Sequence, residues 1–181
     1  MVAAAGILED RTGLMAPELA DPDPQRLRKV LANFPTGVAV VTGDTENGPL
    51  GMAINSFTAL SLKPPMVLFC PAVTSKTWPV LRSDGQLAIN ILSSDQERVS
   101  RAFAGAVQHR FSGVDWTAAA NGSPLLEDAI AWLECEIAAE FLAGDHTIVI
   151  AHVQRIGINK NASSPLVFFR STYHAGMPHR E

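Results

Sequence analysis

The sequence has no surplus of basic residues, and this argues against a general affinity for polyanions. Of its 181 residues, 14 are Lys or Arg and 18 are Asp or Glu, which gives a formal net charge of −4 at pH 7. Binding to nucleic acid or to an anionic membrane surface needs a basic field. We therefore expect no nucleic-acid partner and no membrane partner.

Cysteines and long hydrophobic runs are also scarce. Cys70 and Cys135 form no CxxC pair, so the pattern is that of two reduced thiols rather than a disulfide framework or a zinc site. No apolar run approaches the roughly 18 residues that cross a bilayer. The N-terminus turns acidic at Glu9 and Asp10 and has no basic region before an apolar one, unlike a signal peptide. We expect a cytoplasmic protein.

The familiar catalytic motifs are missing as well. There is no GxSxG elbow, no GxxxxGK[ST] loop, no GxGxxG and no HExxH. His146 and His152 would lie on one strand face, but six strand residues span about 20 Å, too far for both to bind one metal ion. We therefore assign no metal ligands. If the protein is an enzyme, a cofactor carries the chemistry.

What the sequence does contain is enough apolar material for one packed domain. Hydrophobic residues make up 47% of the chain, and a domain of this length buries about 70% of its unfolded surface. We expect a partly ordered arm over 1–23, a domain over 24–176 and a short tail over 177–181. Asp23 and Pro24 are typical of a helix start, and Leu27, Val30, Leu31 and Phe34 follow at helical spacing.

After this helix, the spacing of apolar residues changes from that of a helix to that of short strands. We expect strands near 37–42, 49–55, 66–70, 87–92, 132–138, 146–156 and 166–170. A capping box at Ser94 to Glu97 predicts one further helix, with Val99, Ala102, Phe103 and Ala106 as its apolar stripe, and 112–124 has loop composition. Many short strands with few helices and no βαβ alternation favour a mainly β protein with an antiparallel barrel.

The first candidate site segment is residues 52–62. Asn55, Ser56, Thr58 and Ser61 are interleaved there with apolar residues. Such a pattern offers hydrogen bonds to the heteroatom edge of a flat apolar ring system. The alternative is a strand-to-turn junction whose polar side chains form hydrogen bonds with nearby backbone groups.

The second candidate is the stretch from Thr74 to Thr77, ahead of Trp78 and Pro79. Hydroxyls, the Lys76 ammonium and the free N–H groups of a helix start can together hold a phosphate. The alternative is an ordinary helix cap with a solvated lysine.

Two further segments contain histidine. Gly144 and Asp145 are typical hairpin-turn residues, and His146 follows them at the start of an apolar strand. Its side chain is either a cofactor contact or a structural histidine whose hydrogen bonds are made within the protein. His109, Arg110 and Phe111 combine basic groups with an aromatic ring, which suits a cofactor phosphate or ring but also an ordinary solvated loop.

Taken in order, these segments resemble the flavin reductase-like family, whose fold is the FMN-binding split barrel. The matching pieces lie at 34–38 (FPTGV), 51–69 (GMAINSFTALSLKPPMVLF), 75–78 (SKTW), 109–116 (HRFSGVDW), 144–146 (GDH) and 165–173 (PLVFFRSTY). The resemblance runs from about Leu27 to Tyr173. No single piece is diagnostic, but their order and spacing together are specific.

The resemblance implies a homodimeric NAD(P)H:flavin oxidoreductase that reduces FMN or FAD and supplies reduced flavin to a partner monooxygenase. It implies that His146 contacts the nicotinamide. The flavin contacts that it implies are Thr36, Gly37, Val38, Ala53, Asn55, Ser56, Phe57, Thr58, Ser61, Leu62, Ser75, Lys76, Thr77, Arg110, Phe111, Phe168 and Arg170. One departure is His109-Arg110, where relatives commonly have a lysine before the phenylalanine.

Several alternatives stay open at this point. A split-barrel oxidase that retains its flavin, or a flavin-binding protein without turnover, fits the same segments. The sequence does not choose between FMN and FAD or between NADH and NADPH. Strands near Gly37, Met66 and Leu87 are apolar on both faces, more than one small barrel interior absorbs, which favours a homodimer.

Overall fold

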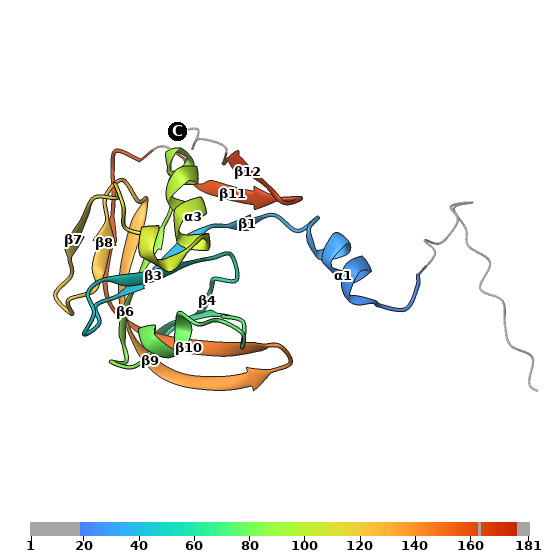
Figure 1. Cartoon of the computed structure of the whole chain (residues 1–181), viewed down its shortest axis with the longest axis horizontal. Coiled ribbons are helices and arrows are strands. Elements are labelled where there is room, and N and C mark those ends of the chain that lie inside the picture. The colour runs from blue at the N-terminus through green and yellow to red at the C-terminus, as the bar shows by residue number, and fades with distance from the viewer. Residues whose placement is uncertain (1–18, 163, 177–181) are drawn as a thin grey trace, which may run out of the picture.

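A computed structural model describes residues 19–162 and 164–176 of the chain, and a curled antiparallel sheet forms its centre (Figure 1). Most of the predicted arm (1–23) and the whole predicted tail (177–181) lie outside the described residues. The described chain otherwise follows the predicted strand order closely.

The central sheet has seven strands in the order β3-β2-β6-β9-β10-β5-β4, and all neighbours are antiparallel. These strands are β2 (Ala39–Gly43), β3 (Leu50–Ile54), β4 (Thr58–Leu62), β5 (Pro65–Phe69), β6 (Gln86–Ile91), β9 (Ala131–Ala143) and β10 (His146–Ile158). Within the described chain, the edge strands β3 and β4 do not pair with each other. The sheet is therefore a barrel with an open seam, as predicted.

Smaller elements surround this barrel. A three-stranded sheet joins β1 (Thr36–Gly37), β11 (Leu166–Phe169) and β12 (Thr172–Ala175), and a two-stranded sheet joins β7 (Trp116–Ala118) and β8 (Pro124–Leu126). The helices are α1 (Pro24–Leu31), α2 (Trp78–Leu81) and α3 (Glu97–Ala104), with 3₁₀ turns η1 (Ser94–Gln96) and η2 (Val107–His109). Strands β4, β7, β8 and β12 were not predicted.

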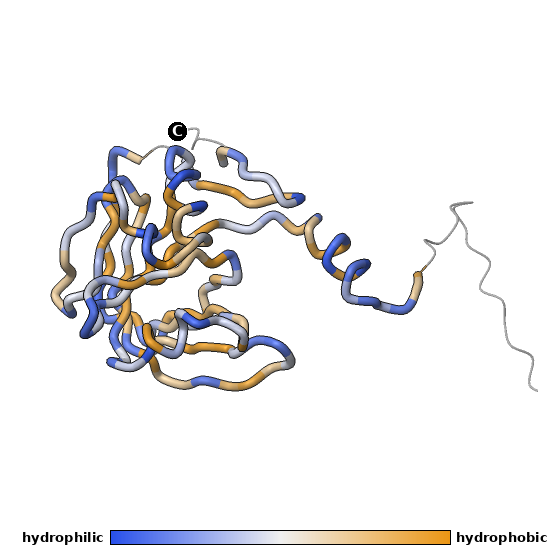
Figure 2. The backbone as a smooth tube through the Cα atoms, viewed as in Figure 1, coloured by the Kyte–Doolittle hydropathy of each residue, from blue (hydrophilic) through white to orange (hydrophobic). Residues whose placement is uncertain are grey.

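Strand β2 is buried along its whole length because two clusters cover its two faces. Val41 belongs to the cluster inside the barrel with Phe69, whereas Val40 belongs to a second cluster with Phe103 and Leu166. Figure 2 shows hydrophobic stretches along the central strands and hydrophilic turns at the periphery. Because one chain covers both faces of β2, the strand near Gly37 gives no reason to expect a second subunit.

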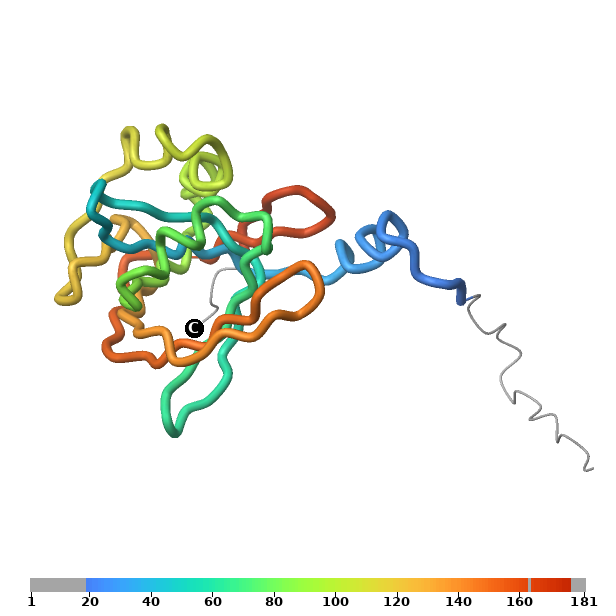
Figure 3. The backbone as a smooth tube through the Cα atoms, turned by 60° about the horizontal axis from the view of Figure 1, so that its bottom comes forward, coloured from blue at the N-terminus to red at the C-terminus, as the bar shows by residue number. Residues whose placement is uncertain are grey.

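Helix α1 begins where the sequence predicts it, but its apolar face is not packed. The Asp23 carboxylate accepts hydrogen bonds from the N–H groups of Gln25 and Arg26. The helix ends at Leu31 and stands apart from the barrel (Figures 1 and 3). Its apolar side chains, with Phe34 just beyond it, are 46 to 74% exposed.

The predicted capping box is displaced by one residue. The reciprocal bonds join Ser93 and Gln96, not Ser94 and Glu97, and they begin the 3₁₀ turn η1 ahead of α3. Ser100 and Phe103 are the buried residues of α3, and Val99 of the predicted stripe packs against the same cluster as Phe103. Ala106 lies beyond the end of α3 and is exposed.

Both thiols are free, and one of them lies in the barrel interior. Burial, followed by the charge of neighbouring Glu134, raises the pKa of the Cys135 thiol to about 12. Burial also raises the pKa of the half-buried Cys70. Both side chains are therefore protonated at neutral pH and act as small apolar groups.

Gly51 in β3 is a position where only glycine fits. A Cβ atom there would lie 2.7 Å from Cε1 of Phe103 and 2.9 Å from the backbone oxygen of Val41. We expect Gly51→Ala to lower the free energy of unfolding by about 1–3 kcal/mol, because the backbone oxygen cannot move aside cheaply. Gly37→Ala is the matched control, since nothing lies within 4 Å of its Cβ position. Urea unfolding measures both, and equal stabilities would contradict the packing described.

None of the helices in residues 19–162 and 164–176 combines the length and the hydropathy needed to cross a membrane.

Candidate functional site

A small pocket of about 190 Å³ lies between β3, α3 and the β11–β12 hairpin. It is lined by Val38, Ala53, Ile54, Asn55, Ser100, Ala104, Phe168 and Tyr173. The rings of Phe168 and Tyr173 lie 5.1 Å apart, and the Tyr173 hydroxyl is 2.8 Å from Ser100 Oγ. Aromatic and aliphatic walls with a few polar groups are typical of a site for a flat ring system.

Thr36 has an unpaired hydroxyl and is paired with Phe168, which lines this small pocket. Its Oγ1 atom is buried and has no hydrogen-bond partner among the described residues. Thr36 is the direct cross-strand partner of Phe168, so the two side chains lie on the same face of the sheet. An unsatisfied buried hydroxyl costs about 1–3 kcal/mol, and a ligand heteroatom at this position would satisfy it.

A second pocket, the Lys76 pocket, has a volume of about 600 Å³. It is lined by Thr45, Asn47, Gly48, Pro49, Leu50, Lys76, Thr77, Val80, Val107, Gln108, Phe111 and Ser112. These residues come from the β2–β3 turn, the loop before α2 and the loop around η2. Of the residues predicted as flavin contacts, it brings Lys76, Thr77 and Phe111 together.

The loop at 75–77 uses two of its hydroxyls internally. Ser75 Oγ accepts the N–H of Trp78 at 3.1 Å, and the buried Thr77 Oγ1 accepts from the Arg110 guanidinium at 2.9 Å. Helix α2 has only four residues, so it adds little to anion binding. Lys76 is exposed and is the cationic side chain that lines the pocket within the described chain.

Arg110 lies between the two pockets and connects neighbouring segments of the chain by hydrogen bonds. Its guanidinium donates to the carbonyl oxygens of Gly105 and Gly51 and to the Thr77 hydroxyl, and the residue is 9% exposed. Burial lowers the pKa of this guanidinium from its ordinary value. Arg110 therefore holds Thr77 against β3, and most of its donors are used before any ligand binds.

The predicted contacts between 56 and 62 lie along the open seam of the barrel. The Ser56 hydroxyl is bonded to the backbone of Cys70 in both directions, and Phe57 packs on the interior cluster. Thr58, Ser61 and Leu62 lie on β4, and Leu62 is 87% exposed at the tip of the β4–β5 hairpin (Figure 3). None of these five residues lines either pocket.

His146 begins β10 and is fixed against the same loop that contains Lys76. Ala72 pairs with His146 in an isolated bridge, and the N–H of Val73 donates to the Asp145 carbonyl oxygen. His146 Nδ1 lies 2.7 Å from Asp145 Oδ1. Because a carboxylate only accepts, this bond places a proton on Nδ1 and leaves Nε2 for another partner. The bond and the charge of His146 lower the pKa of Asp145.

Arg170 lines neither pocket. Its Nε donates to Asn33 Oδ1 at 2.9 Å, and its backbone N–H donates to the Ala32 carbonyl oxygen. The residue has a left-handed backbone conformation with φ of 48°. It fastens the end of α1 to the β11–β12 hairpin, beside Thr36 and Phe168.

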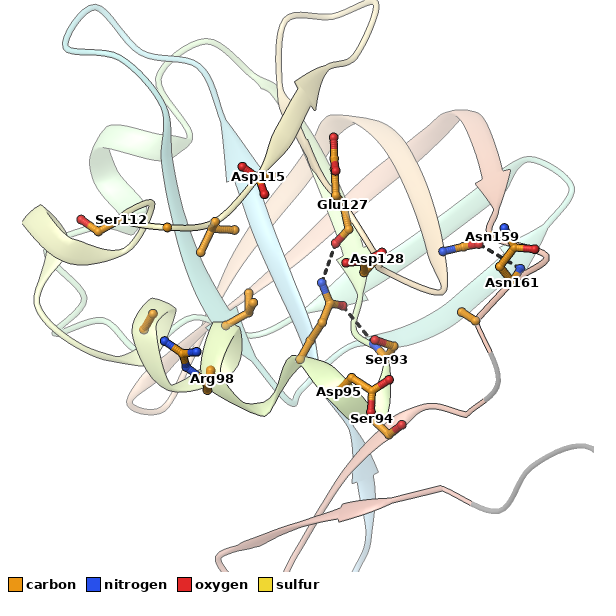
Figure 4. Close-up of a pocket in the computed structure, with 16 residues that line it drawn as sticks. Ser93, Ser94, Asp95, Arg98, Ser112, Asp115, Glu127, Asp128, Asn159 and Asn161 are labelled. Carbon is orange, nitrogen blue, oxygen red and sulfur yellow. Dashed lines mark hydrogen bonds between the residues drawn. The ribbon is translucent and has the colours of Figure 1, made fainter.

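A third pocket, of about 620 Å³, has several acidic residues in its lining and is shown in Figure 4. Four carboxylates, those of Asp95, Asp115, Glu127 and Asp128, are accompanied by one guanidinium, that of Arg98. Gln96 braces one wall by donating to the Glu127 carbonyl oxygen while its own Oε1 accepts the Ser93 N–H. Such a negative lining disfavours nucleotide phosphates. We therefore place no nucleotide there.

Sequence reasoning missed the contribution of α3 and of the β2–β3 turn. Ser100 and Ala104 line the small pocket, although neither is in the predicted apolar stripe of the helix. Asn47 and Gln108 line the Lys76 pocket. Small residues on a helix and amides in turns have no distinctive spacing, so only the fold reveals them.

Comparison with known proteins identifies the family of this chain. The family model described as a flavin reductase like domain matches residues 31–177. The chain belongs to the flavin reductase-like family. This membership confirms the predicted fold class and the predicted flavin reductase activity.

Individual relatives extend over most of this flavin reductase. The reductase subunit HsaB of a flavin-dependent monooxygenase from Mycobacterium tuberculosis is 37% identical over 152 residues, which cover 83% of this chain and 81% of the relative. A flavin reductase from Pseudomonas putida is 40% identical and covers 83% of this chain and 89% of its own. Among solved structures, the NADH:FAD oxidoreductase SgcE6 of Streptomyces globisporus matches with a TM-score of 0.84 at 35% identity, over 91% and 100% of the two chains.

The residues present fit a flavin. The small pocket offers apolar walls to a ring with hydrogen-bonding edges, and the unpaired Thr36 hydroxyl lies on the residue paired with Phe168 in its wall. The Lys76 pocket offers an ammonium to a phosphate. Strand β3 joins the two, because Ala53 lines the first and Leu50 lines the second.

Proposed function

We propose that this chain oxidises NADH or NADPH, reduces FMN or FAD, and passes the reduced flavin to a partner monooxygenase. Support comes from relatives named as reductase subunits of flavin-dependent monooxygenases, and from a solved relative in complex with NAD and FAD fragments. Two free thiols and the use of a nicotinamide nucleotide favour the cytoplasm as its location.

The observation that supports this function most strongly is the aromatic small pocket, together with the unpaired hydroxyl of Thr36, the cross-strand partner of Phe168 in the pocket wall. We place the flavin ring against Ala53, Asn55 and Phe168, with its phosphate at Lys76. A bound flavin supplies the hydride acceptor. The protein orients the two rings face to face at about 3–3.5 Å and excludes water, and it needs no acid or base for the transfer.

Turnover with free flavin tests this proposal. Purified protein mixed with NADH and excess FAD or FMN, under anaerobic conditions, is expected to consume NADH for many turnovers until the flavin is reduced. Ultrafiltration is then expected to recover the reduced flavin in the filtrate. Consumption of only one equivalent of NADH, with the flavin retained by the protein, would instead identify an oxidase or a flavin-storing protein.

We also propose that the protein is a homodimer with the flavin site near the subunit boundary. The support is the exposed apolar face of α1 (Leu27, Val30, Leu31) together with Phe34. An isolated helix of eight residues is marginal in water, so its apolar side needs a partner surface. Arg170 fastens this helix beside Thr36 and Phe168, which places the face near the small pocket.

Light scattering tests the dimer. We expect twice the chain mass at micromolar concentration for the wild type and for Arg28→Asp, and the monomer mass for Leu31→Asp, because a charge on the apolar face opposes burial. Leu31 is exposed in the single chain, so circular dichroism is expected to show an unchanged barrel. A monomeric wild type would contradict the proposal.

A further inference from the structure

The Lys76 pocket is larger and more apolar than a terminal phosphate requires. Its volume of about 600 Å³ lies within the roughly 300–1,000 Å³ of small-molecule sites. Beyond the ammonium, its walls are formed by Pro49, Leu50, Val80, Val107 and Phe111. A phosphate gains nothing from such walls, whereas a further flat apolar group does.

Strand β3 sets the distance between the two pockets. Leu50 lines the Lys76 pocket, and Ala53 and Asn55 line the small pocket, three to five residues further along the chain, with Asn55 directly after β3. At about 3.3 Å per residue this is on the order of 10–16 Å. That length suits a flavin with its ring in the small pocket and its first phosphate at Lys76, so the rest of the Lys76 pocket lies beyond this phosphate.

Polar groups in the outer part of the pocket suit a purine base. The side-chain amides of Asn47 and Gln108 form no hydrogen bond among the described residues, and both residues are exposed. A side-chain amide pairs with the N6 and N7 atoms of adenine in a bidentate way. Gly48, with φ of 95°, and the bond from Thr45 Oγ1 to its carbonyl oxygen fix the turn that presents Asn47.

We propose that the Lys76 pocket binds the adenosine diphosphate part of FAD, so that this chain prefers FAD to FMN. The proposal rests on the proposed function, because it takes the flavin phosphate to lie at Lys76. The adenosine diphosphate of NADH has the same chemistry, but FAD is favoured because the pocket continues directly from the loop that holds the flavin phosphate. The adenine lies between the Asn47 and Gln108 amides and the apolar walls.

Calorimetric titration with riboflavin, FMN and FAD tests the proposal on the full chain. For the wild type we expect FAD to bind at least about tenfold more tightly than FMN. The double variant Asn47→Ala/Gln108→Ala is expected to lower the FAD affinity to that of FMN and to leave FMN binding unchanged. Gln154→Ala, at an exposed glutamine on β10, is the matched control and is expected to change neither.

Three results would overturn the proposal, and they differ from a failure of the proposed function. Equal affinities for FMN and FAD in the wild type would show that the pocket does not bind the adenosine diphosphate part of FAD. An unchanged FAD affinity in the double variant would show that the two amides do not contact FAD. A raised KM for NADH with unchanged FAD affinity would assign the pocket to the nicotinamide nucleotide. In this titration, the proposed function itself fails if no flavin binds at all.

Discussion

Replacing His146 with alanine is expected to raise the KM for NADH and to slow flavin reduction by about 100-fold, with flavin affinity nearly unchanged. The ring is held by the 2.7 Å bond from Nδ1 to Asp145, and the hairpin is bonded to the Lys76 loop through Val73. Its Nε2 is therefore presented at a fixed place, where it can orient the nicotinamide carboxamide. Displacing a reacting ring by about 1 Å costs on the order of 100-fold in rate.

Stopped-flow reduction of bound flavin at several NADH concentrations measures this effect. His152→Ala is the matched control, because His152 lies six residues further along the same strand and pairs with Met66, whereas His146 pairs with Ala72 ahead of Lys76. We expect the control to behave as the wild type. If His146→Ala also matched the wild type at every NADH concentration, His146 would be a structural residue of the hairpin.

Lys76→Ala is expected to weaken FMN binding by about 1.5–3 kcal/mol, which is roughly 10- to 150-fold, while the protein stays as stable as the wild type. Lys76 is exposed and forms no ion pair among the described residues, so the fold does not depend on it. The loss comes from removing a charged contact to the phosphate.

Riboflavin supplies a ligand control for this variant because it has no phosphate. Its affinity is expected to be the same in the wild type and in Lys76→Ala, and Lys63→Ala, in the exposed β4–β5 turn, is expected to change neither ligand's affinity. An unchanged FMN affinity in Lys76→Ala would move the phosphate site elsewhere. Arg110 would then be a poor substitute, because its guanidinium is already bonded to Gly51, Gly105 and Thr77.

Local pattern was sufficient to predict most of the barrel. Strands β2, β6 and β10 were predicted because their apolar runs have strand length and are bounded by turn residues. Strand β4 was missed because its residues, Thr58 to Leu62, are largely exposed at an edge, where burial does not impose a pattern. The capping box was displaced because Ser93 and Ser94 are both acceptable caps, and only tertiary contacts choose between them.

The site was harder to predict because its residues depend on distant partners. Arg110 was expected to contact a phosphate, yet its hydrogen-bond acceptors on Gly51 and Thr77 lie 59 and 33 residues away in the sequence. No local pattern indicates that such acceptors will surround a guanidinium. Lys76, by contrast, was expected to be available for a ligand and is exposed, because nothing in its loop competes for the ammonium.

The most direct test of this account is a crystal structure of the protein with bound FAD. We expect the ring between Ala53, Asn55 and Phe168, with the Thr36 hydroxyl bonded to a ring heteroatom and the first phosphate within hydrogen-bond distance of Lys76. The adenine is expected beside Asn47 and Gln108. A flavin whose phosphates lie in the pocket of Asp95, Glu127 and Asp128, or whose ring leaves Thr36 Oγ1 unpaired, would contradict the account.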